Sequence, residues 1–239
     1  GLGDVYKRQV MGVTQGAGLS LKWFRDNFFL EEMQTAKGMG VDPYYLMDRQ
    51  AERAPIGANR LVYLPYLMGE RSPKLDSDCR GVFFGLSAMH TKYDMLRAVM
   101  EGVIYSQREC LDILRGMGVV SSEMLACGGG GSSPMWRQMM ADVYNLPVKT
   151  VVSKEGPALG VAILAGVGAG IYSSVAEACR KVVKTNPAQA PIPENTGRYE
   201  EFYRVYCGLY PQLKDCYKAL AGYCCWPRFS SSHMDFLIS

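Results

Sequence analysis

The stretch MLACGGGGSSPMWRQMMADVY, residues 124–144, decides the fold. Its first four residues form a short apolar run that predicts a strand, and this run passes directly into four glycines. A helix is predicted from Ser133 to Tyr144, and a second strand from Val148 to Val152. Strands that alternate with helices in this way are typical of an α/β protein.

The sequence on both sides of this unit predicts more helix than strand. Apolar residues at the 3.6-residue period predict a long helix from Tyr93 to Arg115, which Gly116 and Gly118 end. Further helices are predicted at 17–30, 43–53, 157–169, 173–184 and 197–221, and further strands at 61–64 and 81–86. The expected fold class is therefore α/β and helix-rich.

The composition is that of a globular protein with a core. Of 239 residues, 48% are hydrophobic and 21% are charged, which excludes a fibrous or disordered chain. The net charge of +3 is small, and no basic run is interleaved with aromatic residues. Nucleic acid is therefore not an expected partner.

Cysteine and histidine are spaced in a way that disfavours a metal site or a disulfide framework. The chain has 8 cysteines without a C-x-x-C pair, and its 2 histidines lie far apart in the sequence. Most cysteines are therefore predicted to be small buried hydrophobic residues. The protein is expected to be cytoplasmic, where thiols stay reduced.

The segment 156–176 has no charged residue and is about as long as a bilayer span. However, Pro157 and several glycines interrupt it, and its strongly apolar part covers only 161–171. A buried helix followed by a loop is predicted here, and no membrane partner is expected.

The glycine run at 128–131 is the strongest local indication of a ligand. Glycines allow a close approach to the backbone and positive φ angles, and the following helix start presents free N–H groups. A flexible strand-to-helix turn explains the same pattern equally well. The run is neither a P-loop nor a dinucleotide-binding loop, because no Gly-Lys-Ser/Thr follows and Ser133 stands where the third glycine would be. A nucleotide is the first candidate ligand.

A longer pattern resembles a known family. Gly81-x-Phe83-x-Gly85-Leu86 is followed after seven residues by Asp94-Met95 and, two residues later, by Ala98-Val99-Met100-Glu101. This pattern is similar to the second signature of the FGGY carbohydrate kinases. The runs at 63–73, 128–142 and 156–166 (YLPYLMGERSP, GGGGSSPMWRQMMAD and GPALGVAILAG) resemble the same family in the same order. The resemblance covers roughly 10–221 and, within the family, is strongest to the xylulose kinases.

The resemblance implies an actin-like, ribonuclease-H-like ATPase fold with two domains around a cleft. Sugar would bind the first domain and ATP mainly the second, and this chain resembles most of the second, C-terminal domain. The implied reaction is ATP-dependent phosphorylation of a pentulose, D-xylulose to D-xylulose 5-phosphate, with Mg²⁺ as the metal cofactor. The implied partners are ATP or ADP, a small sugar and the first domain of the same kinase, with a homodimer left open.

Two alternatives to this function stay open. One is a kinase of the same family for glycerol, gluconate, ribulose or fuculose. The other is a non-catalytic actin-like module that binds a nucleotide. A dinucleotide-dependent oxidoreductase is disfavoured because the glycine pattern does not match.

The resemblance also implies the residues of the nucleotide site. The glycine loop would lie against adenosine, and one upstream segment would add a second pair of contacts. The implied nucleotide-binding residues are Gly18, Lys22, Gly128, Gly129, Gly130, Gly131 and Ser133. Lys22 departs from the glutamine often found at this position in glycerol kinases, and a solvated helix face is the alternative for it.

No catalytic residue is assigned. The family's general base is an aspartate in a G-G-G-D-N-like segment, followed by a phosphate loop, and neither Asp4 nor Asp26 has that context. The chain alone is therefore expected to be inactive. Glu70 is expected in an ion-paired loop, Glu101 is expected to be a hydrogen-bonded structural carboxylate, and the small residues of 156–166 are expected to let a helix pack beside the glycine loop.

Three segments are expected along the chain. Residues 1–9 lack a recognisable pattern and are interpreted as a non-native leader, and 10–221 as the kinase-like domain. Residues 222–239 change character abruptly, with paired cysteines and a serine triplet. They are interpreted as a non-native tail, with a genuine variable C-terminus as the alternative.

Overall fold

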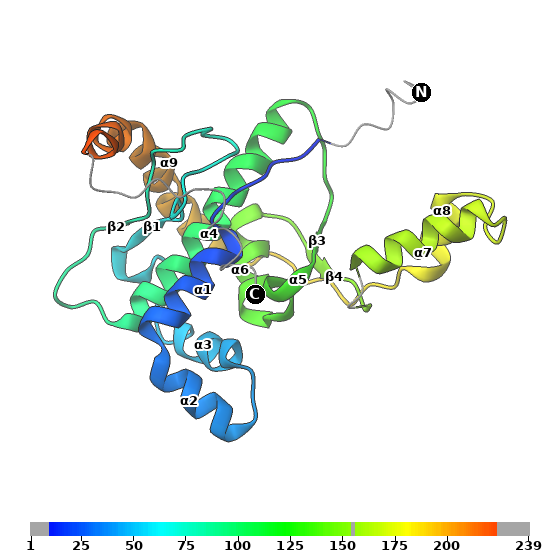
Figure 1. Ribbon diagram of the computed structural model, residues 1–239, viewed down its shortest axis with the longest axis horizontal. Coiled ribbons are helices and arrows are strands. Elements are labelled where there is room, and N and C mark those ends of the chain that lie inside the picture. The colour runs from blue at the N-terminus through cyan, green and yellow to red at the C-terminus, as the bar shows by residue number, and fades with distance from the viewer. Residues whose placement is uncertain (1–9, 154–155, 224–239) are drawn as a thin grey trace.

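The computed structural model describes residues 10–153 and 156–223. Helices surround one long central helix, and the strands of the described residues form two separate two-stranded sheets (Figure 1). The prediction of a helix-rich α/β chain is confirmed. The predicted leader, 1–9, and the predicted tail from residue 224 onward lie outside the described residues.

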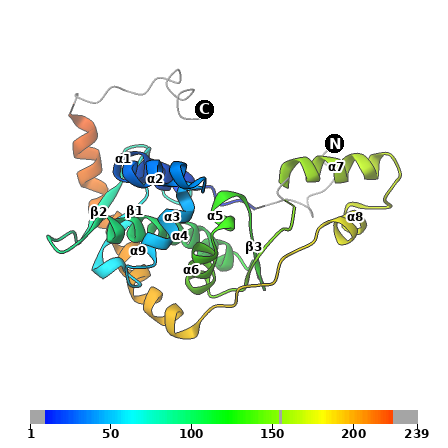
Figure 2. The same ribbon diagram turned by 90° about the horizontal axis from the view of Figure 1, so that it is seen from below.

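The central helix, α4, spans Lys92–Gly116 and confirms the predicted long helix. A capping box starts it: the Thr91 hydroxyl accepts a hydrogen bond from the Tyr93 N–H, and the Asp94 carboxylate accepts one from the Thr91 N–H at 2.8 Å. Neighbouring elements cover α4 on several sides (Figure 2). The side chains on it that are almost fully buried include Leu96, Val99, Met100, Val103 and Ile104.

Strands β1 (Val62–Leu64) and β2 (Val82–Phe84) pair antiparallel, with Tyr63 opposite Phe83. Strand β1 is buried throughout and packs on α4, and each strand is shorter than the predicted run that contains it. Strands β3 (Met124–Ala126) and β4 (Val148–Thr150) pair in parallel.

Three short helices, α1 (Ala17–Phe28), α2 (Leu30–Met39) and α3 (Pro43–Ala51), precede β1. Helices α1 and α3 confirm the predictions at 17–30 and 43–53, with ends shifted by up to two residues. Helix α2 was not predicted. Its only buried residue is Ala36, so its sequence carries no apolar stripe that could reveal it.

The parallel strands β3 and β4 are connected through two helices, one more than the sequence predicted for this unit. The expected glycine loop is itself a short helix, α5 (Gly128–Ser132), and α6 (Pro134–Tyr144) follows it. Between the two helices Ser133 is extended, with φ −78° and ψ 118°. This one residue turns the chain from α5 into α6.

Helices α7 (Gly156–Gly168) and α8 (Val175–Val182) lie away from the central helix and pack mainly on each other (Figures 1 and 2). The prediction of a buried helix here was wrong: Val161 is 67% and Leu164 60% exposed. The apolar composition of α7 predicted burial. Burial requires several neighbouring elements, however, and α8 is the main described neighbour of α7. The expected packing beside the glycine loop is also absent in the described residues, because a Cβ added at Gly160 would meet no atom within 4 Å.

Among the described helices, none combines the length and the apolarity that a bilayer crossing requires. Helix α9 (Pro193–Gly222) begins four residues before the predicted helix and packs a row of tyrosines toward the core. Its buried aromatic residues are Tyr199, Tyr203, Tyr206, Tyr210 and Tyr217.

The prediction that most cysteines are buried was wrong for the described part of the chain. Cys79 and Cys110 are buried, whereas Cys179 and Cys207 are half-buried and the remaining two, Cys127 and Cys216, are exposed. Cys127 directly follows β3 and is the N-cap residue of α5, and Cys216 lies on the outward side of α9. The described cysteines are all free thiols.

Candidate functional site

A cavity of about 390 Å³ opens where helices α1, α3, α5 and α6 meet. The two sides of the cavity come from segments that lie far apart in the sequence. Its lining consists of Gly18 and Leu21 from α1, Asp42, Tyr44, Tyr45 and Asp48 from α3 and its N-cap, Gly129, Gly130 and Ser132 from α5, and Ser133, Pro134 and Trp136 at the start of α6.

Gly129 and Gly130 of α5 line one wall of this cavity, and the backbone around them explains why glycines stand here. Gly128 has φ +75°, a left-handed conformation that favours glycine. A Cβ added at Gly130 would lie 2.9 Å from the Trp136 ring, and one at Gly131 would lie 3.0 Å from the Ala126 carbonyl oxygen. A Cβ added at Gly129 would meet no atom within 4 Å. Gly129 therefore faces open space, and its backbone is accessible to a ligand.

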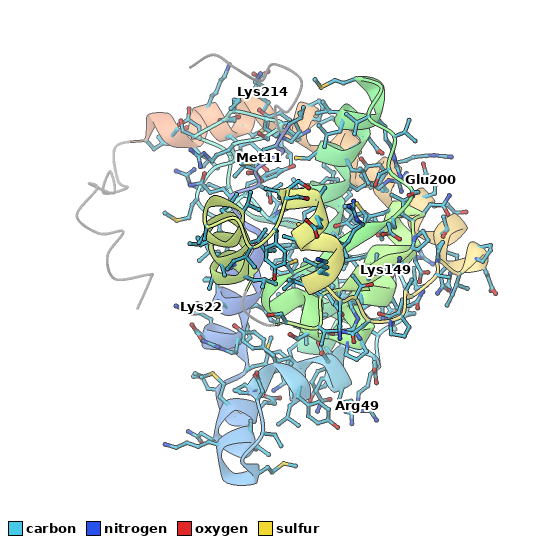
Figure 3. All side chains as sticks on the ribbon, turned by 90° about the vertical axis from the view of Figure 1, so that its right-hand side faces the viewer. Met11, Lys22, Arg49, Lys149, Glu200 and Lys214 are labelled. Carbon is cyan, nitrogen blue, oxygen red and sulfur yellow. The ribbon has the colours of Figure 1, made fainter. Side chains whose placement is uncertain are left out.

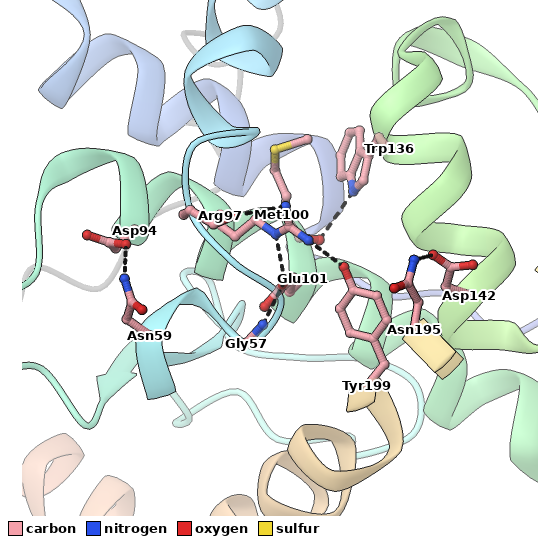
Figure 4. Close-up of polar contacts among 11 residues, drawn as sticks. Gly57, Asn59, Asp94, Arg97, Met100, Glu101, Trp136, Asp142, Asn195 and Tyr199 are labelled. Atoms are coloured by element: carbon pink, nitrogen blue, oxygen red, sulfur yellow. Dashed lines mark hydrogen bonds and ion pairs between the residues drawn. The ribbon is translucent and has the colours of Figure 1, made fainter. Parts of the chain in front are cut away.

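Ser133 connects the glycine wall to the opposite side of the cavity. Its Oγ accepts a hydrogen bond from the Trp136 N–H at 3.0 Å and so caps α6. The Ser133 side chain also faces Asp48 across the cavity and lowers the pKa of its carboxyl group. The Trp136 indole N–H in turn donates to the Met100 carbonyl oxygen at 3.2 Å, which fixes this corner of the cavity to α4 (Figure 4).

Helix α3 supplies two aromatic side chains to the other wall. Arg25 of α1 donates a hydrogen bond to the Tyr44 hydroxyl at 3.1 Å, and its guanidinium lies 5.0 Å from the centre of the Tyr44 ring. Tyr44 is therefore held in place, whereas Tyr45 is 56% exposed. Aromatic faces beside accessible backbone form a surface that suits a flat base.

The α3 side of the cavity is negatively charged and rich in hydrogen-bond acceptors. The pKa of Asp48 is raised above its usual value, mainly because the carboxyl group is partly buried. The nearby carboxylates Glu52 and Asp42 also raise it, and the Ser133 side chain lowers it. The nearest arginine along the helix, Arg49, pairs with Glu52 at 2.9 Å. Among the described residues, therefore, no cation forms an ion pair with Asp48.

The structure brings together four of the residues that the sequence implied for a nucleotide: Gly18, Gly129, Gly130 and Ser133 line one cavity. Lys22, Gly128 and Gly131 are not among the residues that line it. Lys22 lies one turn further along α1, half-buried (Figure 3). Gly128 and Gly131 shape the backbone of α5 instead.

The α3 side of the cavity was missed by sequence reasoning. Asp42-Pro43 predicted where the helix begins, and the Asp42 carboxylate indeed accepts a hydrogen bond from the Tyr44 N–H at 2.9 Å. No local pattern connects Tyr45 or Asp48 with the glycine run, because only the tertiary fold brings these segments together.

Two other carboxylates take structural roles. Glu101, in α4, accepts hydrogen bonds from the Arg97 guanidinium at 2.7 Å and the Gly57 N–H at 3.2 Å, as expected for a hydrogen-bonded structural carboxylate. Glu70 is buried and forms no ion pair within the described part of the chain, so that expectation was wrong. Its carboxylate is satisfied by the Gln15 and Arg71 N–H groups and the Ser106 hydroxyl, which replace a cation.

The comparisons with known proteins identify the family to which this helix-rich chain belongs. Residues 7–169 match the FGGY family of carbohydrate kinases, C-terminal domain. This match covers more than half of the chain. The chain belongs to the FGGY family of carbohydrate kinases, and its fold is that of their actin-like ATPase C-terminal domain.

Individual relatives are sugar kinases with two named substrates. The chain is 38% identical over 204 residues to a xylulose kinase of Staphylococcus epidermidis, covering 85% of this chain and 39% of that kinase. It is 36% identical over 219 residues to a gluconokinase of Bacillus licheniformis, covering 89% of this chain and 41% of that kinase. The crystal structure of a ligand-bound xylulose kinase from Lactobacillus acidophilus matches with a TM-score of 0.77 and 28% identity, over 87% of this chain and 40% of that one. The chain therefore spans about two fifths of the length of these kinases.

Proposed function

We propose that this chain is the nucleotide-binding part of an ATP-dependent sugar kinase, and that the cavity between α3 and α5 holds the adenosine portion of ATP or ADP. One observation supports the proposal: Gly18, Gly129, Gly130 and Ser133, which the resemblance assigns to the nucleotide independently, line a single cavity. Its walls of open backbone and aromatic rings fit a planar, largely apolar group.

Each residue of the proposed site has a distinct task. The open backbone at Gly129 would lie against the nucleoside, and Ser133 would fix the start of α6 beside it. Gly128, Gly130 and Gly131 would keep the turn tight. Gly18 would allow α1 to approach the ligand, because a Cβ there meets no atom within 4 Å. The proposed set is completed by Lys22, on the next turn of α1.

The proposed reaction is transfer of the γ-phosphoryl group of ATP to a hydroxyl of a sugar. This chain would bind and orient the nucleotide, and the remainder of the kinase would supply the sugar site and the general base. ATP would act together with Mg²⁺. The described residues contain no group of three His, Cys, Asp or Glu side chains that could hold a metal ion, so we assign Mg²⁺ no protein ligand here.

D-Xylulose, giving D-xylulose 5-phosphate, is the proposed sugar, because the first relatives compared and the matched crystal structure are xylulose kinases. Gluconate is the second candidate, favoured by the similarity to a gluconokinase at nearly the same identity. The proposed location is the cytoplasm, where ATP and small sugars are available.

Isothermal titration of ADP into the chain and into its Gly129→Val variant tests the nucleotide site. The new side chain meets no protein atom at Cβ, so the fold should tolerate it, but it would occupy ligand space. We expect binding at least tenfold weaker in the variant. Gly38→Val is the matched control, because Gly38 lies in α2 with equally open space and outside the cavity. Equal ADP affinities of wild type and Gly129→Val would contradict the proposal.

A further inference from the structure

Asp48 lies at the α3 side of the cavity with unused capacity for hydrogen bonds. A carboxylate can accept about four of them, and among the described residues Ser133 is the one side chain that acts as a donor in lowering the pKa of Asp48. Both residues line the cavity, so the free lone pairs of Asp48 are available to a bound molecule. A group that donates hydrogen bonds is the chemistry that fits this position.

The charge around Asp48 determines which end of a nucleotide can lie next to it. Asp42 and Glu52 act on Asp48 as further negative charges on the same side of the cavity. Phosphate groups are repelled by such a surface and are expected at the end of the site away from α3. The base is the part of a nucleotide farthest from its phosphates, so the base is the part that lies next to Asp48.

The shape of the cavity agrees with this orientation. Tyr44 and Tyr45 stand on the same helix as Asp48, and Gly129 leaves open space on the facing wall. A flat ring fits between aromatic faces and bare backbone, and its edge would then meet the carboxylate.

We propose that Asp48 accepts a hydrogen bond from the exocyclic 6-amino group of adenine and thereby selects adenine nucleotides over 6-oxo purine nucleotides. The inference rests on the proposed nucleotide function and adds the residue that determines the base. A 6-oxo purine places an oxygen acceptor against the carboxylate at this position. Two acceptors facing each other leave both without a donor, which disfavours binding.

The test compares ADP with inosine diphosphate, which differs by the 6-oxo group and the N1 proton that accompanies it. In the wild-type chain, isothermal titration should give ADP at least about tenfold tighter binding than inosine diphosphate, as expected for one hydrogen bond to a charged group. In Asp48→Asn the side-chain amide offers both an oxygen and an N–H₂ group. The ratio of the two affinities should therefore fall to within about twofold.

Three controls keep the outcomes distinct. Asp48→Asn preserves size and the acceptor for Ser133, and its thermal unfolding midpoint should stay close to that of the wild type. Glu52→Gln removes a neighbouring charge that does not line the cavity, and it should keep the wild-type preference for ADP. 2′-Deoxy-ADP keeps the adenine base, so Asp48→Asn should change its affinity by the same factor as the affinity for ADP.

Each result has one interpretation. If the wild-type chain binds neither diphosphate, the proposed function fails, and this inference fails with it. If ADP binds but the preference for it is absent, or survives Asp48→Asn, only the role of Asp48 is refuted. If Asp48→Asn weakens the binding of ADP but leaves the affinity for 2′-deoxy-ADP unchanged, the carboxylate binds ribose, and the inference about the base is wrong.

Discussion

The Arg97 guanidinium and the Glu101 carboxylate, one helical turn apart on α4, form a buried ion pair at 2.7 Å (Figure 4). Arg97 also donates to the Tyr199 hydroxyl of α9 at 2.7 Å and to the Ala54 carbonyl oxygen at 3.2 Å. Glu101 accepts from the Gly57 N–H. One charged pair therefore connects the central helix to α9 and to the segment before β1.

Breaking this pair from one side is expected to destabilise the fold strongly. Arg97→Met leaves the Glu101 carboxylate, whose side chain is 2% exposed, without its cation, and should lower the free energy of unfolding by about 3–5 kcal/mol. The double variant Arg97→Met/Glu101→Leu should lose less than the sum of the single variants, because no lone charge remains. Urea unfolding followed by circular dichroism measures all three.

The matched control is Arg49→Met, which breaks the exposed Arg49–Glu52 pair. The side chains of this pair are 63% and 45% exposed, so Arg49→Met should lower the free energy of unfolding by at most about 1 kcal/mol. Equal losses for Arg97→Met and Arg49→Met would contradict the structural role of the buried pair.

The capping box of α4 predicts a pH dependence. Burial alone would raise the pKa of Asp94, but hydrogen bonds from the Thr91 N–H and hydroxyl and from the Asn59 amide lower it below the usual 3.8. A lowered carboxyl pKa stabilises the fold above pH 3.8, and this stabilisation is lost as the pH falls through the lowered value. Asp94→Asn should therefore lower the free energy of unfolding by about 1 kcal/mol at pH 7 and by clearly less at pH 2.

Thermal unfolding of both chains at the two pH values measures this difference. Asp215→Asn, an exposed change on α9, should have little effect at either pH. A penalty for Asp94→Asn that is equal or larger at pH 2 would show that the carboxylate does not stabilise the cap through its charge.

Sequence reasoning located elements with an apolar stripe and failed where only tertiary contacts decide. The long helix α4 was predicted from its buried face, whereas α2, with Ala36 as its only buried residue, gave no periodic signal. Helix α7 was expected to be buried from its composition, but burial depends on a neighbour, and composition does not reveal which neighbour is present. The resemblance found the glycine side of the candidate site. Asp48 was missed because folding alone brings it to Ser133.

Two glycines with opposite environments are expected to respond oppositely to alanine. Gly57 has φ +79°, and a Cβ there would lie 2.0 Å from the Phe202 ring of α9. Gly57→Ala should therefore cost about 2 kcal/mol or more. Gly38 lies inside α2 with no atom within 4 Å of an added Cβ, so Gly38→Ala should stabilise the chain by about 0.5–1 kcal/mol.

Urea unfolding midpoints of the two alanine variants decide this prediction. The sign is the essential result, because a general sensitivity to alanine would move both midpoints in the same direction. Stabilisation by Gly57→Ala would mean that α9 does not press on the segment before β1 as the structure describes.

The chain alone is expected to bind ADP without phosphorylating D-xylulose in the presence of ATP and Mg²⁺. We expect no aspartate of this chain to act as the family's general base, because none was found in a G-G-G-D-N-like segment, and Asp26 is ion-paired with Arg25 at 2.6 Å. Nucleotide binding alone cannot remove a proton from a sugar hydroxyl or position it for attack. A coupled assay of ADP release with D-xylulose or D-gluconate, calibrated with an intact sugar kinase, should give the rate of a blank without protein. Sugar-dependent turnover that disappears in Gly129→Val would overturn the prediction, whereas turnover that persists in this variant would identify a contaminating kinase.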